Sequence, residues 1–342
     1  MKAASLMGVV AANHIIPVDL YINGTYKGSY NFTEKVGLAG NSVDLDDESA
    51  AALLELDKYF DEVATQKFRS TQYSTPVNIK SPDFGEDETL LTLELIKNRY
   101  NSFETAAANG GDIADHLDLE ALTRFMMTNE YICNIEFFHP KSTFLYNENI
   151  LDENSKFIFG PVWDLDWALG YNGSTAASYF NNNIERDYYN TDLPFKDLLN
   201  ILHDDLRVKQ RTWELWNDFI AKGLDELCEY CQDFYNYAKP SITNNKNAGL
   251  DSFNYANQIP KAISWFRQRA NFIMSKLEEE LFVAGDVNGD LIVSMEDLTA
   301  LINYLLTNSS SGISMTGANV NNDSEVNMDD LTALIDILLS QN

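Results

Sequence analysis

The sequence predicts an α+β protein with a mainly helical carboxyl-terminal part, followed by a small all-α module. Three observations support this fold class. Strand-like alternation is concentrated before residue 160, helical spacing dominates residues 195–281, and an internal repeat occupies the end of the chain. Because strands and helices do not alternate strictly, a mixed α+β arrangement is favoured over repeated βαβ units. The chain of 342 residues suits a large domain at 1–282 and a small one at 283–342.

The large domain is predicted to begin with a helix and a β-hairpin. Residues 1–12 contain one lysine and a short apolar stretch that only faintly imitates a signal peptide, so a helix leading into a strand is the favoured interpretation. Asn23-Gly24, the preferred two-residue hairpin turn, separates two strand-like segments. The elements expected in this part are strands over 18–22 and 27–36, a helix over 44–68 and a short strand over 76–82.

Helices and one further strand pair make up the rest of the large domain. Gly110-Gly111 ends a segment with helical spacing, and Asp118 is a typical N-cap for the next helix. A polar loop separates two short strands that precede an aspartate-rich motif. The expected elements are helices over 88–108 and 119–133, strands over 144–146 and 157–159, and mainly helix over 195–281 with a polar loop at 241–258.

The composition excludes several classes of partner. A net charge of −28 argues against nucleic-acid and anionic-membrane binding, because phosphate recognition needs lysine and arginine. No run of about 18 apolar residues is present, so no transmembrane helix is expected. With 45% hydrophobic residues, the chain can form a proper core. The three cysteines do not make a disulfide framework and are interpreted as packing residues: Cys133, Cys228 and Cys231.

The repeat at the end of the chain has the spacing of a calcium loop. Segments 286–297 and 319–330 both carry oxygen-bearing side chains at loop positions 1, 3, 5, 9 and 12, and both continue as Leu-Thr-Ala-Leu-Ile with helical spacing. A hard cation takes about six to eight oxygen ligands in an EF-hand-type loop. The alternative, two polar turns before amphipathic helices, is disfavoured by the repeated match. The predicted calcium ligands are Asp286, Asn288, Asp290, Ile292, Ser294 and Asp297 in the first loop, and Asn319, Asn321, Asp323, Glu325, Asn327 and Asp330 in the second.

This part of the chain resembles the type I dockerin family, calcium-folded modules that bind cohesin domains on scaffoldins or cell surfaces. The resemblance covers about residues 284–342 and implies a cohesin partner, calcium-dependent folding and an extracellular or cell-surface location. Leu291 and Ser324 stand at loop position 6, where glycine is usual. Asn319 replaces aspartate at position 1, so the second loop is expected to bind calcium more weakly. Positions 10 and 11, where dockerins carry cohesin specificity, are occupied by Met295, Glu296, Met328 and Asp329.

The best candidate for chemistry in the large domain is the motif Trp163-Asp164-Leu165-Asp166-Trp167. Two carboxylates two residues apart in an extended segment point the same way. Together they could hold Mg²⁺, which typically takes one or two protein carboxylates plus phosphate oxygens. The alternative is an acidic, aromatic loop stabilised by backbone hydrogen bonds, since structural carboxylates also cluster. Spacing alone leaves both interpretations open.

The large domain also resembles the spore-coat protein H (CotH) kinases, atypical secreted or surface protein kinases. The matches are the segment 20–34, with its Asn-Gly turn and Gly-Ser-Tyr strand, and the segment 160–170, which carries the family's Pro-x-Trp-Asp-x-Asp hallmark with one residue's variation. The resemblance implies an atypical kinase-like fold for residues 1–281. By that likeness the site residues are Asp164 for Mg²⁺ with ATP, Asp166 in support of it, and Glu34 as a candidate cofactor-binding residue.

Part of the kinase pattern differs in this chain. The family's catalytic aspartate lies in a segment after the long helix, where this chain has Glu136; a carboxylate there could accept a hydroxyl proton. The amino-terminal part of the kinase domain, with the lysine that holds ATP phosphates, is expected to be missing, and residue 1 is expected to lie inside its parent gene. Lys141 is expected to pair with a nearby carboxylate, and His139 to be structural rather than a base.

Three functions therefore remain open. The first is a CotH-like protein kinase, active or incompletely armed, that uses Mg²⁺ and ATP on a protein substrate and is carried to a surface complex by its dockerin. The second is a non-catalytic surface, scaffold or glycan-binding component of a bacterial polysaccharide-degrading complex. The third, ranked last, is a glycosidase that uses Glu136 and Asp164 as paired carboxylates, for which no hydrolase motif is present.

Overall fold

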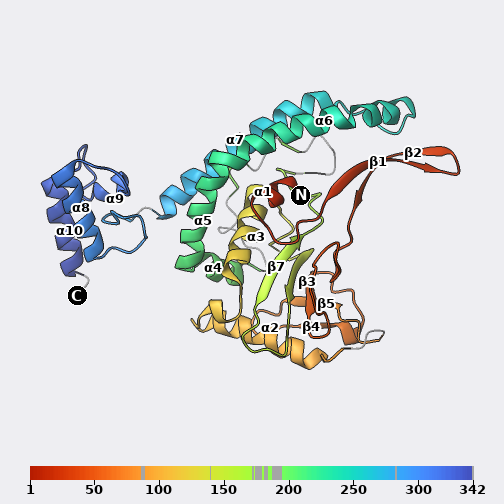
Figure 1. Ribbon diagram of the computed structural model, residues 1–342, viewed down its shortest axis with the longest axis horizontal. Coiled ribbons are helices and arrows are strands. Elements are labelled where there is room, and N and C mark those ends of the chain that lie inside the picture. The colour runs from red at the N-terminus through yellow and green to blue at the C-terminus, as the bar shows by residue number, and fades with distance from the viewer. Residues whose placement is uncertain are drawn as a thin grey trace. The chain divides into compact units, whose positions relative to one another are not determined.

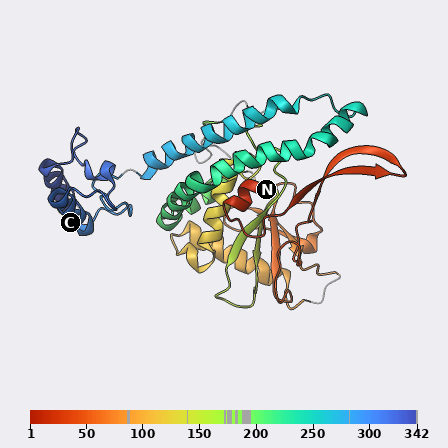
Figure 2. The same cartoon turned by 45° about the horizontal axis from the view of Figure 1, so that its top comes forward.

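The chain divides into two compact units, Met1–Phe272 and Ile273–Asn342. Helices and antiparallel strands occur together in the first unit and helices alone form the described part of the second, so the predicted α+β class is confirmed. Figures 1 and 2 show the elements of each unit. The computed structural model describes residues 1–85, 89–138, 140–171, 173, 179–180, 184–186, 195–281 and 283–340.

A five-stranded antiparallel sheet forms the centre of the first unit. Its strand order is not the order of the sequence, because the strand nearest the amino terminus lies in the middle. Two later strands, at 143–147 and 157–162, pair with each other in antiparallel fashion. The start of the first therefore lies beside the end of the second (Figure 1). In spatial order the strands are β4 (Lys67–Arg69), β5 (Pro76–Ser81), β3 (Ala52–Leu56), β6 (Thr143–Asn147) and β7 (Phe157–Val162).

The central strand β3 corrects the prediction of a helix over 44–68. Leu53, Leu54 and Leu56 are fully buried, although the helical prediction placed them on one side of an amphipathic surface. Leu54 pairs with Ile79 of β5 on one side and with Leu145 of β6 on the other. An apolar run that is covered on both faces forms either a buried strand or a buried helix, and its short length favours the strand. The acidic residues before and after this run led to the wrong prediction of a helix.

Two capped helices pack against the last strand of the sheet. The helix α2 (Leu93–Ala108) begins at Thr92, whose side chain accepts a hydrogen bond from the main chain, and α3 (Leu119–Tyr131) begins at Asp118 in the same way. Both helices agree with the prediction within a few residues. Tyr100 lies 6.0 Å from Phe157 and Phe125 lies 5.6 Å from Phe159, centroid to centroid. These edge and tilted ring contacts fix α2 and α3 on β7. The short helices η1 (Ala64–Gln66) and η2 (Ile113–Asp115) complete this region.

The predicted amino-terminal helix and hairpin are confirmed as α1 (Lys2–Leu6), β1 (Ile15–Ile22) and β2 (Thr25–Thr33). Asn23 and Gly24 both have positive φ, at 51° and 75°, as a two-residue hairpin turn requires. The hairpin lies beside the far end of the helix α6 (Leu224–Asn247), as Figures 1 and 2 show. Asn245 Oδ1 accepts hydrogen bonds from the Tyr26 hydroxyl, at 2.7 Å, and from the Ser29 main chain, at 3.0 Å.

The contact with the hairpin explains why the predicted loop at 241–258 is too long. Helix α6 continues through Pro240 to Asn247, and α7 (Tyr255–Leu281) begins at Tyr255. The polar side chains of 244 and 245 bond to the hairpin and not to solvent alone. The other helical elements of this part, which was predicted to be mainly helical, are α4 (Lys196–Asp204), α5 (Leu206–Asp218) and the π-helical segment η4 (Phe219–Gly223).

The second unit has its own small core. Val287, Leu301, Ala318 and Leu334 are fully buried and pack together. They come from both halves of the repeat, so each half buries its apolar face against the other. Its helices are α8 (Met295–Thr307), α9 (Met315–Ala318) and α10 (Met328–Ser340). Across the described parts of the chain, no helix is both long enough and apolar enough to cross a membrane.

A buried arginine makes a large contribution to the first unit. Arg269 is fully buried and donates to the main-chain carbonyls of Glu130, Ile184 and Arg186 at 2.6 to 2.8 Å. Replacing it with methionine is expected to lower the free energy of unfolding by about 3 kcal/mol, because three partly buried acceptors lose a charged donor. Thermal and denaturant unfolding measure this loss. The control is Arg267→Met, which removes only the exposed pair with Asp225 and is expected to cost less than about 1 kcal/mol.

Candidate metal centres

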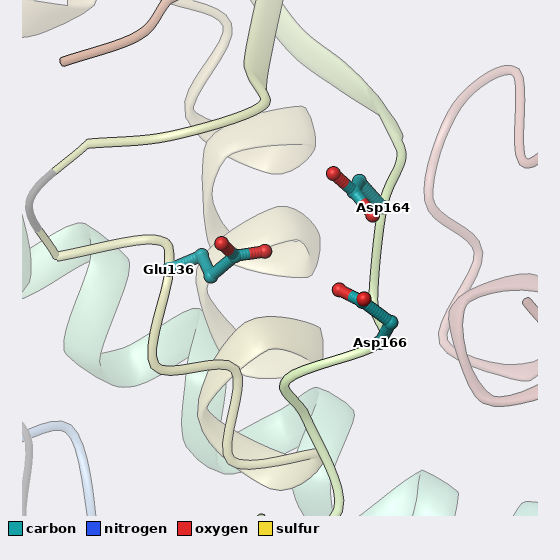
Figure 3. A group of neighbouring side chains, drawn as sticks. All are labelled: Glu136, Asp164 and Asp166. Atoms are coloured by element: carbon teal, nitrogen blue, oxygen red, sulfur yellow. The ribbon is translucent and has the colours of Figure 1, made fainter. Parts of the chain in front are cut away.

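Three carboxylates from two distant segments converge in the first unit. Glu136 lies in the turn that follows α3, and Asp164 and Asp166 follow directly after β7. One carboxylate oxygen from each residue lies within 4.8 Å of those of the other two. Figure 3 shows Asp164 and Asp166 on one segment with their side chains directed toward Glu136 on the facing turn. Carboxylate oxygens gathered at this spacing are the ligand set that a hard divalent cation prefers.

Local hydrogen bonds hold Glu136 in place. The Asn134 side chain accepts from the Glu136 main-chain N–H at 3.2 Å, and it donates to the Asn129 side chain on α3 at 2.8 Å. The Lys141 N–H closes the turn by donating to the Glu136 carbonyl at 2.9 Å. The turn is therefore fixed to the helix at Asn134 and closed on itself by Lys141, and Glu136 is fully buried.

Lys141 joins the carboxylates of the two segments. Its ammonium group forms a short ion pair with Glu136 and lies 3.7 Å from Asp164 Oδ2. It also lies 5.5 Å from the centre of the Trp167 ring. The prediction that Lys141 pairs with a nearby carboxylate is confirmed. Burial lowers the pKa of Lys141, but the hydrogen bond to Glu136 and the charges of Glu136 and Asp164 outweigh it, so the pKa is raised and the side chain stays cationic.

Burial and mutual repulsion disfavour the charged forms of two of these carboxylates. Burial raises the pKa of Glu136, although the bond to Lys141 opposes the shift. Burial also raises the pKa of Asp166, and the neighbouring Asp164 carboxylate adds to it. Glu136 Oε2 is buried with no hydrogen-bond partner among the described residues. Carboxylates that are desolvated, close together and incompletely partnered are characteristic of a functional site.

Ser142 is a further member of the site that the sequence did not reveal. Its hydroxyl lies 3.4 Å from Asp164 Oδ2, within hydrogen-bonding range, and its main-chain N–H donates to the Asp57 carboxylate at 3.4 Å. Ser142 and Asp164 both have positive φ, at 49° and 54°. A single uncharged serine next to Lys141 forms no sequence pattern that would identify it as a site residue. The backbone conformation that turns its hydroxyl toward Asp164 becomes visible only in the fold.

The first calcium loop of the second unit brings its acids together. Asp286, Asp290 and Asp297 form a group whose carboxylate oxygens lie within 4.8 Å of one another. Asp297 is fully buried, and its carboxylate accepts from the main-chain N–H groups of Val287, at 2.7 Å, and Ser294, at 2.8 Å. Loop position 12 therefore closes the loop as well as offering oxygens to a cation.

The second loop repeats this frame with one acid fewer among the side chains at loop positions 1, 3, 5, 9 and 12. Asp330 is fully buried and accepts from the N–H groups of Asn321, at 3.1 Å, and Asn327, at 2.8 Å. At loop position 1, however, the Asn319 amide donates to the Asp323 carbonyl at 2.8 Å, which an aspartate cannot do. The structure thus shows the frame of both loops, and the weaker calcium affinity of the second loop stays a prediction.

Position 6 of the first loop departs from the usual glycine without losing its conformation. Leu291 has a φ of 67°, in the left-handed region that glycine adopts at little cost. Its main-chain N–H donates to Asp286 Oδ2 at 2.9 Å. At loop position 4 both loops have a left-handed backbone conformation, with a φ of 77° at Gly289 and of 57° at Asn322. The hydrogen bond to Asp286 holds the strained leucine in place.

Comparison with protein families gives two matches along the chain. Residues 4–273 match the model of the CotH kinase protein family, which is most of the chain. The chain belongs to the CotH family. Residues 284–339 match the Dockerin type I domain, a domain that binds calcium and implies a cohesin partner. A search of the curated proteins gave no match. Both resemblances inferred from the motifs are thereby confirmed.

Two predicted residues of the CotH domain lie apart from the carboxylates or cannot be placed. The Glu34 carboxylate accepts from the His14 main-chain N–H at 2.7 Å and lies 2.9 Å from the His14 ring. It does not belong to the described group of Glu136, Asp164 and Asp166, and its role in cofactor binding stays a prediction. His139 lies outside the described residues.

The first loop of the dockerin provides a pH-dependent test. Burial raises the pKa of Asp286, although hydrogen bonds from the main chain oppose the shift. A proton therefore competes with calcium at a higher pH than at an ordinary aspartate, because the ligand must be deprotonated. Calcium affinity, measured by calorimetry on the full chain, is expected to be constant near neutral pH and to fall by about tenfold per pH unit for each proton taken up below the raised pKa. An affinity that does not change under acid conditions contradicts this expectation.

Proposed function

We propose that this CotH-family protein is a phosphotransferase that uses Mg²⁺ and ATP to modify a protein hydroxyl group. The observation that supports this function best is the convergence of Glu136, Asp164 and Asp166 around Lys141. Phosphoryl transfer depends mainly on positioning and on neutralising charge, and it needs a metal site, a cation and a proton acceptor. The first unit provides a candidate for each within one group of side chains.

The residues present fit a divalent cation. Asp164 and Asp166 would hold it, and the Glu136 carboxylate adds a further negative charge beside them. The fit is supported by the raised pKa values of Glu136 and Asp166 and by the unpartnered, buried Glu136 Oε2. When bound, a divalent cation neutralises charge on phosphate oxygens and orients them.

The other side chains have distinct roles in this proposal. Lys141 stays protonated, so its ammonium group can donate to a phosphoryl oxygen next to Asp164. Glu136 uses Oε1 for Lys141, which leaves Oε2 to accept the proton of an incoming hydroxyl. Trp167, whose ring lies beside Lys141, covers one side of the ammonium group and limits its contact with water. The phosphoacceptor itself would be a serine, threonine or tyrosine of a protein.

The second unit would deliver this activity to a surface complex. Its predicted cohesin contacts are Met295, Glu296, Met328 and Asp329 at the start of the two helices, and all four side chains are exposed. Met295 and Met328 are 65% and 62% exposed, so both apolar side chains are accessible to a partner. We place the protein outside the cell or at its surface, attached to a cohesin-bearing partner of a polysaccharide-degrading complex.

A non-catalytic role is the second candidate, and one observation favours it. Glu136, the residue that would act as the base, is paired with Lys141, so a cation of the chain itself already engages its carboxylate. In that case the first unit binds a protein or a glycan of the complex. Retained binding to such a partner, with no response to nucleotide, would select this function.

Calorimetric titration of the full chain with ATP decides between the two. The phosphotransferase predicts binding heat with Mg²⁺ or Mn²⁺ present and a much weaker signal with the metal removed, because the site's own charge is negative. Absence of binding with either metal contradicts the proposal. Transfer of the terminal phosphate to a generic protein substrate is the second measurement, since binding alone does not establish catalysis.

A further inference from the structure

The Ser142 hydroxyl lies next to the paired aspartates because of the strand register. Its Oγ donates to Asp164 Oδ2 at 3.4 Å. Thr143 at the start of β6 pairs with Val162 at the end of β7. Ser142 directly precedes the first of these residues, and Asp164 follows the second by two positions. The contact therefore depends on the central sheet and not on a long side chain that reaches across the surface.

Main-chain contacts hold Ser142 without help from its hydroxyl. Its N–H donates to Asp57 Oδ2 at 3.4 Å, and the preceding N–H, of Lys141, donates to the Glu136 carbonyl at 2.9 Å. The left-handed conformation of Ser142, with a φ of 49°, is one that glycine adopts at little cost. The side chain can therefore be removed by a glycine substitution while the turn is kept.

The Ser142 hydroxyl has lone pairs left for a ligand. A hydroxyl group has one hydrogen and two acceptor lone pairs. The hydrogen is used by Asp164, and no donor from the described part of the chain bonds to the Ser142 oxygen. The residue is half-buried, so the oxygen is not committed to bulk water alone. It can bind a cation while it continues to donate to the carboxylate.

The spacing of the two oxygens suits neighbouring ligands of one cation. Adjacent oxygens around an octahedral ion with bonds of about 2.1 Å lie about 3.0 Å apart. The 3.4 Å between Ser142 Oγ and Asp164 Oδ2 is only slightly longer, so a small side-chain rotation brings both oxygens into reach. Serine and threonine hydroxyls hold Mg²⁺ in the P-loop NTPases, which shows that this donor suits a nucleotide-bound ion.

The carboxylates next to Ser142 are not fully occupied by the chain itself. The Lys141 ammonium group is held by Glu136 and lies 3.7 Å from Asp164 Oδ2, which is too long for a hydrogen bond. Glu136 is fully buried, and its Oε2 has no hydrogen-bond partner among the described residues. Figure 3 shows the Glu136 carboxylate directed toward the two aspartates. A buried acceptor without a donor is typical of a site that an ion or substrate completes.

We propose that the Ser142 hydroxyl is a direct ligand of the divalent cation, beside Asp164. The inference rests on the cation site of the proposed function, and it adds a ligand that lies outside the aspartate motif. A neutral hydroxyl supplies an oxygen without adding to the negative charge of the three carboxylates. As a hard oxygen donor it favours Mg²⁺ or Mn²⁺ over softer cations. Ser142 would thus contribute to the choice of metal as well as to its affinity.

Two substitutions of Ser142 test this role in the full chain with calcium present. Ser142→Gly removes the oxygen and is expected to weaken Mg²⁺-dependent ATP binding, measured by calorimetry, by at least about tenfold. Ser142→Cys replaces the oxygen with sulfur and is expected to weaken binding with Mg²⁺ while largely keeping it with Co²⁺ or Zn²⁺, because sulfur ligands favour softer cations. With Co²⁺, this variant is also expected to show a sulfur-to-metal charge-transfer absorption band that the wild type lacks.

The matched controls are Ser74→Gly and Ser74→Cys. Ser74 is exposed in the turn between β4 and β5, and its φ of 55° is close to that of Ser142. Both control variants are expected to bind ATP as the wild type does with each metal and to show no absorption band with Co²⁺. Circular dichroism of all four variants measures whether the fold is retained.

The outcomes separate a metal ligand from a serine that only orients Asp164. Equal losses with Mg²⁺ and Co²⁺ in Ser142→Cys, without an absorption band, overturn the inference. ATP binding that Asp164→Asn abolishes but Ser142→Gly leaves unchanged overturns it too, while the proposed function stands. An absorption band in Ser142→Cys without any nucleotide binding supports the ligand and contradicts the phosphotransferase. Metal-dependent ATP binding that survives in Asp164→Asn overturns both the ligand and the cation site.

Discussion

Asp164→Asn is expected to abolish metal-dependent nucleotide binding and any phosphotransfer. Asp164 is the carboxylate that both Lys141 and Ser142 approach, at 3.7 and 3.4 Å from its Oδ2. Loss of a residue that only orients a metal ligand costs about 10- to 100-fold in affinity, so loss of a ligand itself should cost at least about 100-fold. Calorimetry with Mg²⁺ and ATP measures the first effect and radiolabel transfer the second.

The choice of asparagine separates charge from backbone strain. Asp164 has a φ of 54°, a conformation in which asparagine and aspartate are favoured and alanine is strained. The amide side chain of the variant keeps the shape and the turn but removes the negative charge. The control is Asp233→Asn, which removes the same charge from an exposed position on α6. Unchanged ATP binding in the Asp164 variant would show that the carboxylates are structural.

Calcium removal is expected to unfold the second unit while the first stays folded. Four of its residues make up the fully buried apolar core, which is too small to order two loops rich in carboxylates without a cation. Hydrogen exchange measured by mass spectrometry on the full chain is expected to show loss of protection in α8 and α10 on adding a chelator. Exchange in α2 and α3 is expected to remain slow. Protection of α8 that is unaffected by the chelator contradicts calcium-dependent folding.

Asp297→Ala is expected to reproduce the effect of the chelator on the first loop. The substitution removes a cation ligand and leaves the main-chain donors of Val287 and Ser294 without their acceptor. The expected cost is on the order of 3 kcal/mol or more, because each buried donor left unpaired costs about 1–3 kcal/mol. Asp336→Ala, on the exposed face of α10, is the matched control and is expected to have little effect. Wild-type protection of α8 in the Asp297 variant would contradict the assigned ligand role.

The sequence indicated the candidate carboxylates and predicted the strands β5, β6 and β7, but it did not predict the central strand β3. Asp164 and Asp166 could be identified because their motif is short, local and carried by residues of unusual chemistry. The strand β3 could not, because Leu53, Leu54 and Leu56 become distinguishable from a helical face only when β5 and β6 cover both of their sides. The prediction that the two aspartates point the same way was confirmed, although Asp164 itself has a left-handed backbone conformation.

Long-range contacts account for the other differences. The polar residues around Asn245 look like a loop in isolation, and they are helical because the hairpin, more than two hundred residues earlier in the chain, supplies partners for their side chains. Ser142 was missed for the same reason, since its partner Asp164 lies in the distant segment that follows β7. Local patterns thus predicted elements and motifs, while the fold alone shows which distant residues complete a site.

The ammonium group of Lys141 acts as a counter-ion that the chain provides for itself. With Glu136, Asp164 and Asp166 ionised, this one positive charge leaves the group with two negative charges in excess. A single divalent ion cancels that excess, whereas a monovalent ion leaves half of it. Charge balance alone therefore favours Mg²⁺ or Mn²⁺ over Na⁺ or K⁺ at this position, and it does so before any ligand geometry is considered. The Lys141 ammonium group also holds Glu136 and Asp164, which lie on two different segments, close together without a metal ion. A cation can therefore bind without first having to bring these two segments closer.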